Sequence, residues 1–346
     1  MGKIKAGIIN VTGYAGVELA RLLFQHPEVN LISVTGRGTA GKKLAEVFPH
    51  LAGIDLTIKT DLDEVEVVFS ALPHRESAAE IIPLIKQGLK VIDLSADFRL
   101  REAGDYPRWY DSHHPAPELL DEAVYGLPEL KRARIAKAKL VANPGCYPTG
   151  AILAIAPAVQ AGIVKPEIII DSKSGVSGAG RTLNMGSHYA EANEDMTAYA
   201  LSGHRHLPEI TQELGELTPG AAPVVTFVPH LIPMTRGIFT TGYATLIPGK
   251  LAEGDKGLLE LVELYQDRYR NEPFVRVTSS PPHTKHTSGS NFCLVYPTID
   301  SNTGHLIVLS CLDNLVKGAA GQAIQNMNLM LGIPEDTGLK AVALYP

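Results

Sequence analysis

With 346 residues, the chain exceeds the length at which a single hydrophobic core usually stops growing, so two domains are expected. Hydrophobic residues make up 45% and charged residues 20%, and the formal net charge of −6 argues against nucleic acid as a partner. The apolar segments are short and interrupted, which argues against a membrane span, and the first residues do not resemble a signal peptide. Three cysteines argue against a disulfide framework, so we expect a reducing, cytoplasmic location.

The first part of the chain alternates short apolar strands with amphipathic helices. Apolar residues recur at helical spacing after Gly16, and alternation of strands with such helices is typical of parallel βαβ units. The pattern predicts a doubly wound, Rossmann-type sheet. Its expected strands are 3–9, 30–35, 65–71, 90–94 and 139–142, and its expected helices are 16–24 and 78–87.

After about residue 146 the predicted elements change character. The strands become longer and richer in Thr, Val, Tyr and Phe, which favours an α+β domain with a mostly antiparallel sheet. We expect strands at 167–172, 224–228, 237–246, 290–297 and 305–311, and helices at 152–161, 258–270 and 317–331.

The first strand ends in the turn Asn10-Val11-Thr12-Gly13-Tyr14-Ala15-Gly16, which leads directly into a helix. Such a turn brings backbone N–H groups and the positive end of a helix to a pyrophosphate. Gly13 would allow close approach of the backbone, and Gly16 would allow close packing of helix on strand. Asn10 stands where the usual pattern has its first glycine, but asparagine tolerates left-handed backbone angles. A simple turn remains the alternative for these glycines.

The end of the second strand indicates which dinucleotide binds. NAD-selective sites usually have an acidic residue there, whereas this chain has Val34-Thr35-Gly36-Arg37. A guanidinium suits the 2′-phosphate of NADP through bidentate hydrogen bonds, so Arg37 favours NADP over NAD. A solvated loop charge is the alternative interpretation of Arg37.

Cys146 is the candidate nucleophile. It lies in Asn143-Pro144-Gly145-Cys146-Tyr147-Pro148-Thr149-Gly150, between a strand and an apolar helix. The dipole and free N–H groups of a helix N-terminus stabilise a thiolate and can hold an oxyanion. Cys293 and Cys311 lie within apolar strand runs and are expected to be structural.

Two further segments contain candidate site residues. Gly203-His204-Arg205-His206 supplies proton-transfer groups ahead of a helix, although an exposed polar turn would look similar. The loop from Ser174 to Arg181 could hold an anionic leaving group, or could be a glycine-rich surface loop. His283 and His286 have metal-like spacing but no second ligand pair, so no metal is expected.

Over essentially its full length, the chain resembles the N-acetyl-gamma-glutamyl-phosphate reductase family of arginine biosynthesis. Residues 143–150 resemble the family's active-site cysteine signature. Supporting matches occur, in order along the chain, at 12–16, 71–74, 93–100, 177–181, 203–210 and 313–323.

The resemblance implies a semialdehyde-dehydrogenase or glyceraldehyde-phosphate-dehydrogenase-like fold. Residues 1–145, completed by 313–346, would bind NADP, and residues 146–312 would form the catalytic and oligomerisation domain. The implied reaction is NADPH-dependent reduction of a small-molecule acyl phosphate, N-acetyl-gamma-glutamyl phosphate, to N-acetylglutamate 5-semialdehyde. Cys146 would form a thioester with release of phosphate, and a hemithioacetal would then collapse to the aldehyde. The implied assembly is a homo-oligomer, either a dimer or a tetramer.

The resemblance also assigns residues to roles. Cys146 is the nucleophile and His204 the general acid/base. The expected substrate-binding residues are Arg99, Asn143, Ser177, Arg181, Arg205 and His206. The expected cofactor-binding residues are Asn10, Thr12, Gly13, Tyr14, Ala15, Gly16, Arg37, Leu72, Pro73, Ser95, Asn314 and Gly318.

Three alternatives remain open. The related reductase of lysine biosynthesis acts on a carrier-bound aminoadipyl phosphate, but Tyr147-Pro148-Thr149 resembles the arginine branch. Its acidic carrier would require a basic docking surface, and the sequence shows no concentrated basic stretch. Aspartate-semialdehyde dehydrogenase shares the chemistry but differs around the cysteine and histidine. A non-catalytic NADP-binding sensor would have no need to keep Cys146 and His204.

Overall fold

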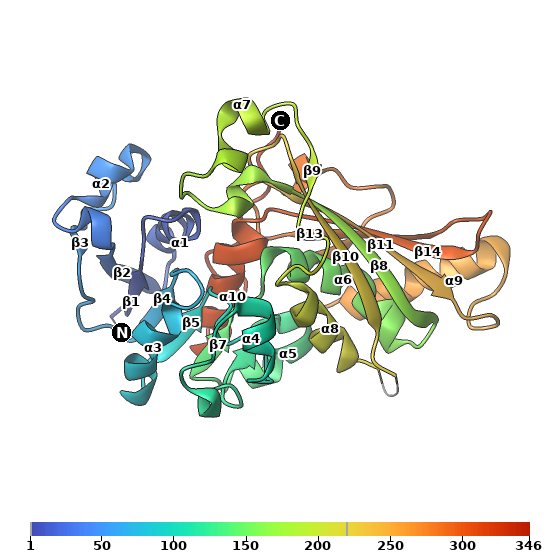
Figure 1. The fold of residues 1–346 in the computed structure, drawn as a ribbon, viewed down its shortest axis with the longest axis horizontal. Helices are drawn as coiled ribbons and strands as arrows, with labels where there is room; N and C mark the ends of the chain where they lie inside the picture. The colour runs from blue at the N-terminus through green and yellow to red at the C-terminus, as the bar shows by residue number, and fades with distance from the viewer. Residues whose placement is uncertain (1, 219–220) are drawn as a thin grey trace. The chain divides into compact units, whose positions relative to one another are not determined.

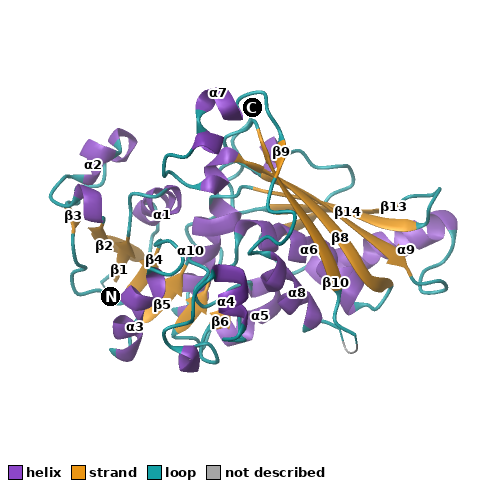
Figure 2. Ribbon diagram, viewed as in Figure 1, coloured by secondary structure: helices purple, strands orange, loops and turns teal. Residues whose placement is uncertain are grey.

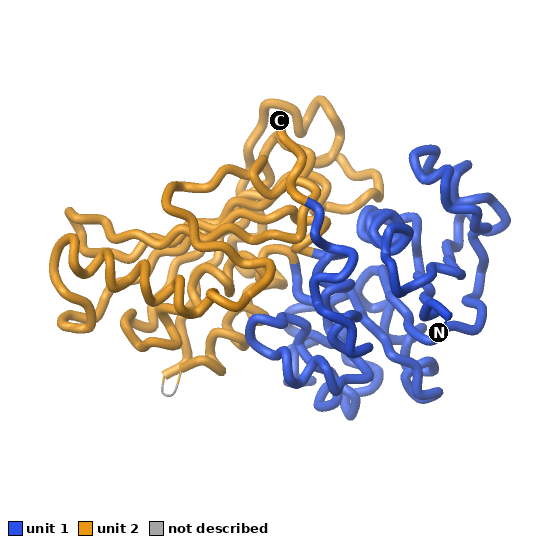
Figure 3. The backbone as a smooth tube through the Cα atoms, turned by 180° about the vertical axis from the view of Figure 1, so that it is seen from behind, with its two compact units in different colours: residues 1–145, 319–341 blue, residues 146–318, 342–346 orange. Residues whose placement is uncertain are grey.

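The computed structural model describes residues 2–218 and 221–346, which fold as two compact units. Unit 1 contains residues 1–145 and 319–341, and unit 2 contains residues 146–318 and 342–346 (Figure 3). The sequence placed all of 313–346 with the first domain. Residues 313–318 and 342–346 instead lie in unit 2. Asn314, in the first of these segments, accepts from the Gly237 amide of that unit.

Unit 1 is built on a parallel seven-stranded sheet in the order β3-β2-β1-β4-β5-β7-β6 (Figure 1). Parallel pairing follows from the helical crossovers that the sequence predicted. Helices α3 and α4 contribute to one apolar cluster around Val68 and Val91, whereas α1 packs against α10. The strands are Ile4–Ile9 (β1), Val29–Thr35 (β2), Ile58–Lys59 (β3), Val67–Ser70 (β4), Lys90–Asp93 (β5), Val124–Tyr125 (β6) and Leu140–Ala142 (β7). The helices are Tyr14–Phe24 (α1), Leu44–Val47 (α2), Ser77–Lys86 (α3), Asp105–Tyr110 (α4), Pro128–Ile135 (α5) and Gly321–Met330 (α10).

Unit 2 is built on a mixed seven-stranded sheet in the order β12-β13-β14-β11-β8-β10-β9. Figure 2 labels β8, β9, β10, β13 and β14 of this sheet. Most neighbouring strands are antiparallel, as predicted, but β12 with β13 and β8 with β10 run parallel. The strands are Val164–Gly175 (β8), Thr197–Ala198 (β9), Val224–Ile232 (β10), Ile238–Leu246 (β11), Val275–Val277 (β12), Cys293–Ile299 (β13) and His305–Leu312 (β14). The helices are Cys146–Gln160 (α6), Tyr189–Ala192 (α7), Leu207–Gly215 (α8) and Gly254–Tyr269 (α9).

Helix α6 forms the centre of unit 2. All of its residues from Tyr147 to Val159 are buried, and it packs against β8, β11, β13 and β14. The sequence predicted a start at residue 152, whereas the helix begins at Cys146. Pro148 is compatible with this early start because the first helical N–H groups have no partner within the helix. The last predicted helix is also divided, into a π-helical turn at Val316–Ala320 followed by α10.

Gly16 sets how closely α1 approaches β1. A Cβ atom at this position would lie 2.5 Å from the Asn10 carbonyl oxygen and 2.8 Å from the Val11 Cα. Both atoms belong to the backbone, so neither can move away cheaply.

We therefore expect Gly16→Ala to destabilise the fold by about 1–3 kcal/mol, the usual cost of overpacking. Gly104→Ala is the matched control, because a Cβ there meets nothing within 4 Å and its φ is −68°. Urea unfolding followed by circular dichroism measures both variants. Equal stability of the two would show that the α1–β1 approach tolerates a methyl group.

Candidate active site

The glycine-containing turn of unit 1 has the geometry of an anion-binding helix start. Asn10 adopts the left-handed region at φ 63°, which the sequence anticipated for this departure from the glycine pattern. Its Nδ2 donates to the Ala71 carbonyl at 2.9 Å, and its Oδ1 accepts from the Thr12 hydroxyl at 3.3 Å. Gly13 is the N-cap of α1 and lacks a side chain that could cap the helix, and a Cβ on it would meet only Asn10 Nδ2, at 4.0 Å. The turn therefore leaves space and amide donors for a pyrophosphate.

Arg37 lies directly after β2, where a 2′-phosphate ligand was expected. Its guanidinium pairs with Glu76 Oε2 at 3.1 Å and with Glu80 Oε1 at 2.7 Å. The Arg37 side chain is 71% exposed, and exposed ion pairs contribute only about 0–1 kcal/mol. An incoming phosphate could therefore replace these carboxylates at low cost.

The other predicted cofactor residues of unit 1 lie at the ends of β4 and β5. Leu72 is half-buried and Pro73 is exposed. Ser95 is buried, and its hydroxyl donates to Asp93 Oδ2 at 2.6 Å and accepts from the Asp97 amide at 3.0 Å. Burial, reinforced by Asp97, raises the pKa of Asp93 to about 6. Ser95 thus holds a buried turn, and a contact with cofactor remains a prediction.

Arg99 and Asn143 are joined to each other within unit 1. The Arg99 Nε donates to the Asn143 carbonyl at 2.8 Å, and its Nη2 donates to the Leu94 carbonyl at 2.8 Å. The Asn143 amide group donates to the Ala319 carbonyl at 3.1 Å and accepts from Asn326 at 3.0 Å. Both side chains therefore hold β5, β7 and the start of the last helix in register, and their substrate contacts stay predictions.

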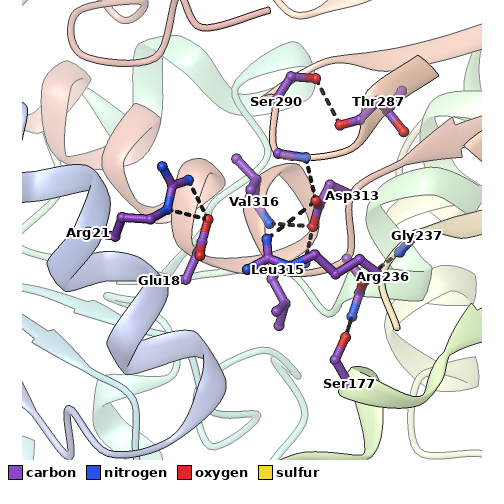
Figure 4. Close-up of polar contacts among 12 residues, drawn as sticks. Glu18, Arg21, Ser177, Arg236, Gly237, Thr287, Ser290, Asp313, Leu315 and Val316 are labelled. Atoms are coloured by element: carbon purple, nitrogen blue, oxygen red, sulfur yellow. Dashed lines mark hydrogen bonds and ion pairs between the residues drawn. The ribbon is translucent and has the colours of Figure 1, made fainter. Parts of the chain in front are cut away.

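Cys146 is the first residue of the 15-residue helix α6 and is half-buried. Gly318 lies against it, because a Cβ on Gly318 would be 2.9 Å from the Cys146 Cβ. Asn314 accepts from the Gly237 amide at 2.8 Å and donates to the Ser177 hydroxyl at 2.9 Å (Figure 4). Unit 2 thus places Gly318 beside Cys146 and joins Ser177 to Asn314, four residues before Gly318.

His204 is buried in an aromatic cluster in the same unit. Its ring centroid lies 5.8 Å from that of Tyr147, 5.4 Å from Tyr199 and 5.5 Å from Phe227. The His206 amide donates to His204 Nδ1 at 3.1 Å, so the neutral ring carries its proton on Nε2. Burial, with a smaller effect of Arg205, lowers the pKa of His204 to about 4. The ring is therefore neutral near pH 7.

The basic residues expected near His204 differ in exposure. His206 is buried with His204, whereas Arg205 is exposed. Arg181 is also exposed, on the loop after β8.

Two tyrosines that the sequence did not single out complete the cluster. The Tyr147 hydroxyl donates to the His230 carbonyl at 2.8 Å, and the Tyr199 hydroxyl donates to that of Tyr147 at 3.3 Å. Burial raises the pKa of both phenols, so both remain protonated donors. Tyr147 could have been found from its place in the cysteine motif. Tyr199 has no local signal, because it comes from a separate, mostly exposed segment.

Comparison with known proteins identifies the family. Residues 5–138 match the family model "Semialdehyde dehydrogenase, NAD binding domain", and residues 146–314 match "Semialdehyde dehydrogenase, dimerisation domain". An N-acetyl-gamma-glutamyl-phosphate reductase of Dehalococcoides mccartyi is 56% identical over 347 residues and 100% of both chains. The chain belongs to this family. The enzyme of the same name from Heliobacterium modesticaldum is 49% identical over 99% of this chain and 100% of its own.

Solved structures of lower identity share the fold. The chain is similar to aspartate semialdehyde dehydrogenase II of Vibrio cholerae, with a TM-score of 0.71 and 17% identity over 96% of this chain and 99% of that one. It is also similar to the aspartate semialdehyde dehydrogenase of Candida albicans with NADP, with a TM-score of 0.69 and 16% identity over 95% and 99%. The predicted fold class and the family resemblance are thus confirmed. Within residues 2–218 and 221–346, no helix is long and apolar enough to cross a membrane.

The lowered pKa of His204 makes a prediction about acid stability. The unfolded ring takes up a proton below about pH 6.5, whereas the folded ring does so only near pH 4, so stability falls as the pH drops between these values. This single group should remove about 2 kcal/mol of stability between pH 7 and pH 5. We expect His204→Gln to show a correspondingly smaller difference in unfolding free energy between pH 7 and pH 5 than the wild type. His50→Gln, at an exposed position, is the control and should leave the difference unchanged. A full wild-type difference in His204→Gln would contradict the neutral, buried state of the ring.

Proposed function

We propose that the protein reduces N-acetyl-gamma-glutamyl phosphate to N-acetylglutamate 5-semialdehyde with NADPH, releasing phosphate, through a thioester on Cys146. The observation that carries this proposal is 56% identity over the full length to a reductase of that name. The local geometry supports it, because Cys146 opens a buried helix in the unit that also contains a neutral, buried His204.

Cys146 performs the covalent steps. The backbone N–H groups and the dipole of the α6 N-terminus stabilise its thiolate. The sulfur attacks the carbonyl carbon of the acyl phosphate, the carbon–oxygen bond to phosphate breaks, and phosphate leaves with the bonding electrons. After reduction, the carbon–sulfur bond of the hemithioacetal breaks, which releases the aldehyde and restores the thiolate.

His204 supplies a hydrogen-bond donor to the reacting carbonyl. Because its pKa is near 4, the ring stores no positive charge at pH 7 and acts as a neutral donor through Nε2–H. We assign this N–H to the oxygen on which negative charge develops when the carbonyl is attacked. The aromatic side chains of Tyr147, Tyr199 and Phe227 fix the plane of the ring.

Unit 1 has the features that NADPH requires. In this proposal the turn from Asn10 to Gly16 holds the pyrophosphate, and Arg37 holds the 2′-phosphate. When bound, NADPH supplies the hydride that reduces the thioester carbon. Leu72, Pro73, Ser95, Asn314 and Gly318 are assigned to the same cofactor.

The anionic groups of the substrate require basic and polar partners. In our proposal, unit 1 serves as the NADP-binding domain. The residues assigned to the substrate are Arg99, Asn143, Ser177, Arg181, Arg205 and His206.

Unit 2 also has a surface suited to self-association, which fits the dimerisation-domain match. Ile169 on β8 and Tyr243 on β11 are register partners on the sheet face that α6 does not cover, and they are 50% and 37% exposed. Exposed apolar side chains that lie side by side on an uncovered sheet face support a subunit interface there. We propose a dimer or tetramer built through this face, acting in the cytoplasm.

The proposed reaction is tested in reverse with purified protein. We expect phosphate-dependent reduction of NADP with N-acetylglutamate semialdehyde and little with aspartate semialdehyde. Cys146→Ser should lower this turnover by at least about 10³-fold, because it removes the thiolate, while leaving NADPH affinity within a few fold. If the protein binds NADPH but turns over neither aldehyde, the result would favour a carrier-bound aminoadipyl phosphate as substrate, or a non-catalytic NADP-binding sensor. Wild-type turnover by Cys146→Ser would exclude the covalent mechanism.

Cofactor preference tests the role of Arg37. Arg37→Ala should weaken NADPH by about tenfold or more and NADH by less than about threefold, because only NADPH has the 2′-phosphate that pairs with a guanidinium. Protein fluorescence titration measures both dissociation constants. Lys137→Ala removes an exposed cation elsewhere in unit 1 and controls for the loss of net charge. Equal losses for both cofactors would remove Arg37 from this role.

A further inference from the structure

Asp313 is a fully buried carboxylate directly after β14, and four donors surround it. Its Oδ1 accepts from the Leu315 amide at 2.8 Å and the Val316 amide at 3.2 Å. Its Oδ2 accepts from the Gly289 amide at 2.7 Å and pairs with Arg236 Nη1 at 3.4 Å (Figure 4). The carboxylate thus fixes the start of the segment 313–318, here called the 313–318 turn.

The same residue also fixes the end of this turn. The Asp313 carbonyl accepts from the Gly318 amide at 2.9 Å, and Gly318 is the residue that lies against the Cys146 Cβ. Between the two ends, Asn314 is held by Gly237 and Ser177. A single side chain and its own carbonyl therefore determine where the backbone beside the nucleophile lies.

A carboxylate suits this position better than an amide would. Asp313 needs two oxygen acceptors, because Oδ1 and Oδ2 each face two N–H donors. Asparagine has one oxygen and one NH₂ group, so one side of it would meet donors and leave buried groups unpaired. Serine or threonine has a single side-chain oxygen, which could replace only one of the two carboxylate oxygens.

We propose that Asp313 is a positioning residue for the reaction. It holds the 313–318 turn so that Gly318 packs on Cys146 and Asn314 keeps its hydrogen bonds to Gly237 and Ser177. The proposal rests on the proposed function, in which Cys146 is the nucleophile. Asp313 acts through the turn and touches neither substrate nor reacting atoms in this scheme.

The test compares Asp313→Asn with Ser290→Ala. Ser290 is buried near the same carboxylate, and its hydroxyl donates to the Thr287 carbonyl at 2.9 Å, so its loss removes a buried hydrogen bond without touching the 313–318 turn (Figure 4). Four quantities are measured for each protein: kcat for phosphate-dependent NADP reduction at saturating substrate, the NADPH dissociation constant, the melting temperature, and the rate of Cys146 alkylation by iodoacetamide.

We expect Asp313→Asn to lower kcat by at least about 20-fold at saturating cofactor, and the NADPH dissociation constant separates this loss from any loss of cofactor affinity. Loosening of the turn should also raise the alkylation rate by at least about threefold. Ser290→Ala should lower the melting temperature with kcat and alkylation close to wild type. A wild-type kcat in Asp313→Asn, or an equal loss of kcat in both variants at equal loss of melting temperature, would overturn the proposal.

A second variant covers the case in which Asp313→Asn does not fold. Arg236 is about one-third exposed, so Arg236→Met can lose the ion pair to Asp313 without leaving a fully buried gap. It should lower kcat several-fold at saturating cofactor, and an unchanged kcat would overturn the proposal. If the wild-type protein reduces no NADP, the proposed function fails, whereas the alkylation rates of Asp313→Asn and Arg236→Met still decide whether the turn positions Cys146.

Discussion

The position of Cys146 at the first residue of α6 is the constraint on which the rest of unit 2 depends. A helix N-terminus presents backbone N–H groups and a positive dipole. These groups stay directed at the thiol only if the helix does not move. Burial of α6 from Tyr147 to Val159 against the mixed sheet provides that rigidity. Tyr147, the second residue of the helix, extends the arrangement to His204 through its ring and to His230 through its hydroxyl. The thiol, the histidine ring and the strand β10 are thereby held by one packed assembly.

Several candidate site residues are hydrogen-bonded to other residues of the chain. Polar groups at buried positions cost free energy unless they are hydrogen-bonded, so they bind one another. Ser177 with Asn314, and Arg99 with the Asn143 carbonyl, show this pattern inside their respective units. Such contacts hold each side chain in one rotamer, which is what a site needs before its ligand arrives. His204 illustrates the electrostatic counterpart, because the burial that orders the ring also keeps it neutral.

The sequence predicted the fold class well, because alternating apolar strands and amphipathic helices are local patterns. The prediction of individual elements failed where a strand was very short, and it missed the first residues of α6. The two-residue strands β3, β6 and β9 contain too few residues for any periodicity. The range predicted for α6 began at residue 152, although Pro148 and Gly150 are both compatible with the observed start at Cys146. The motifs around Cys146 and His204 made both residues site candidates, and their roles stay predictions. The partners of Arg37 could not, because Glu76 and Glu80 lie 39 and 43 residues further along the chain and only the tertiary fold brings them close. Asp313 lies in the segment 313–323 that resembles the family, but the role proposed for it depends on donors contributed by Gly289 and Arg236.

The central claim, a covalent acyl group on Cys146, is tested most directly by omitting the reductant. Fresh N-acetyl-gamma-glutamyl phosphate is mixed with the enzyme without NADPH, released phosphate is followed in the first turnover, and the quenched protein is digested and weighed by mass spectrometry. The account predicts a burst of about one phosphate per subunit and an added N-acetylglutamyl group on the peptide that contains Cys146. Absence of a burst, or an acyl group on a different residue, would contradict it.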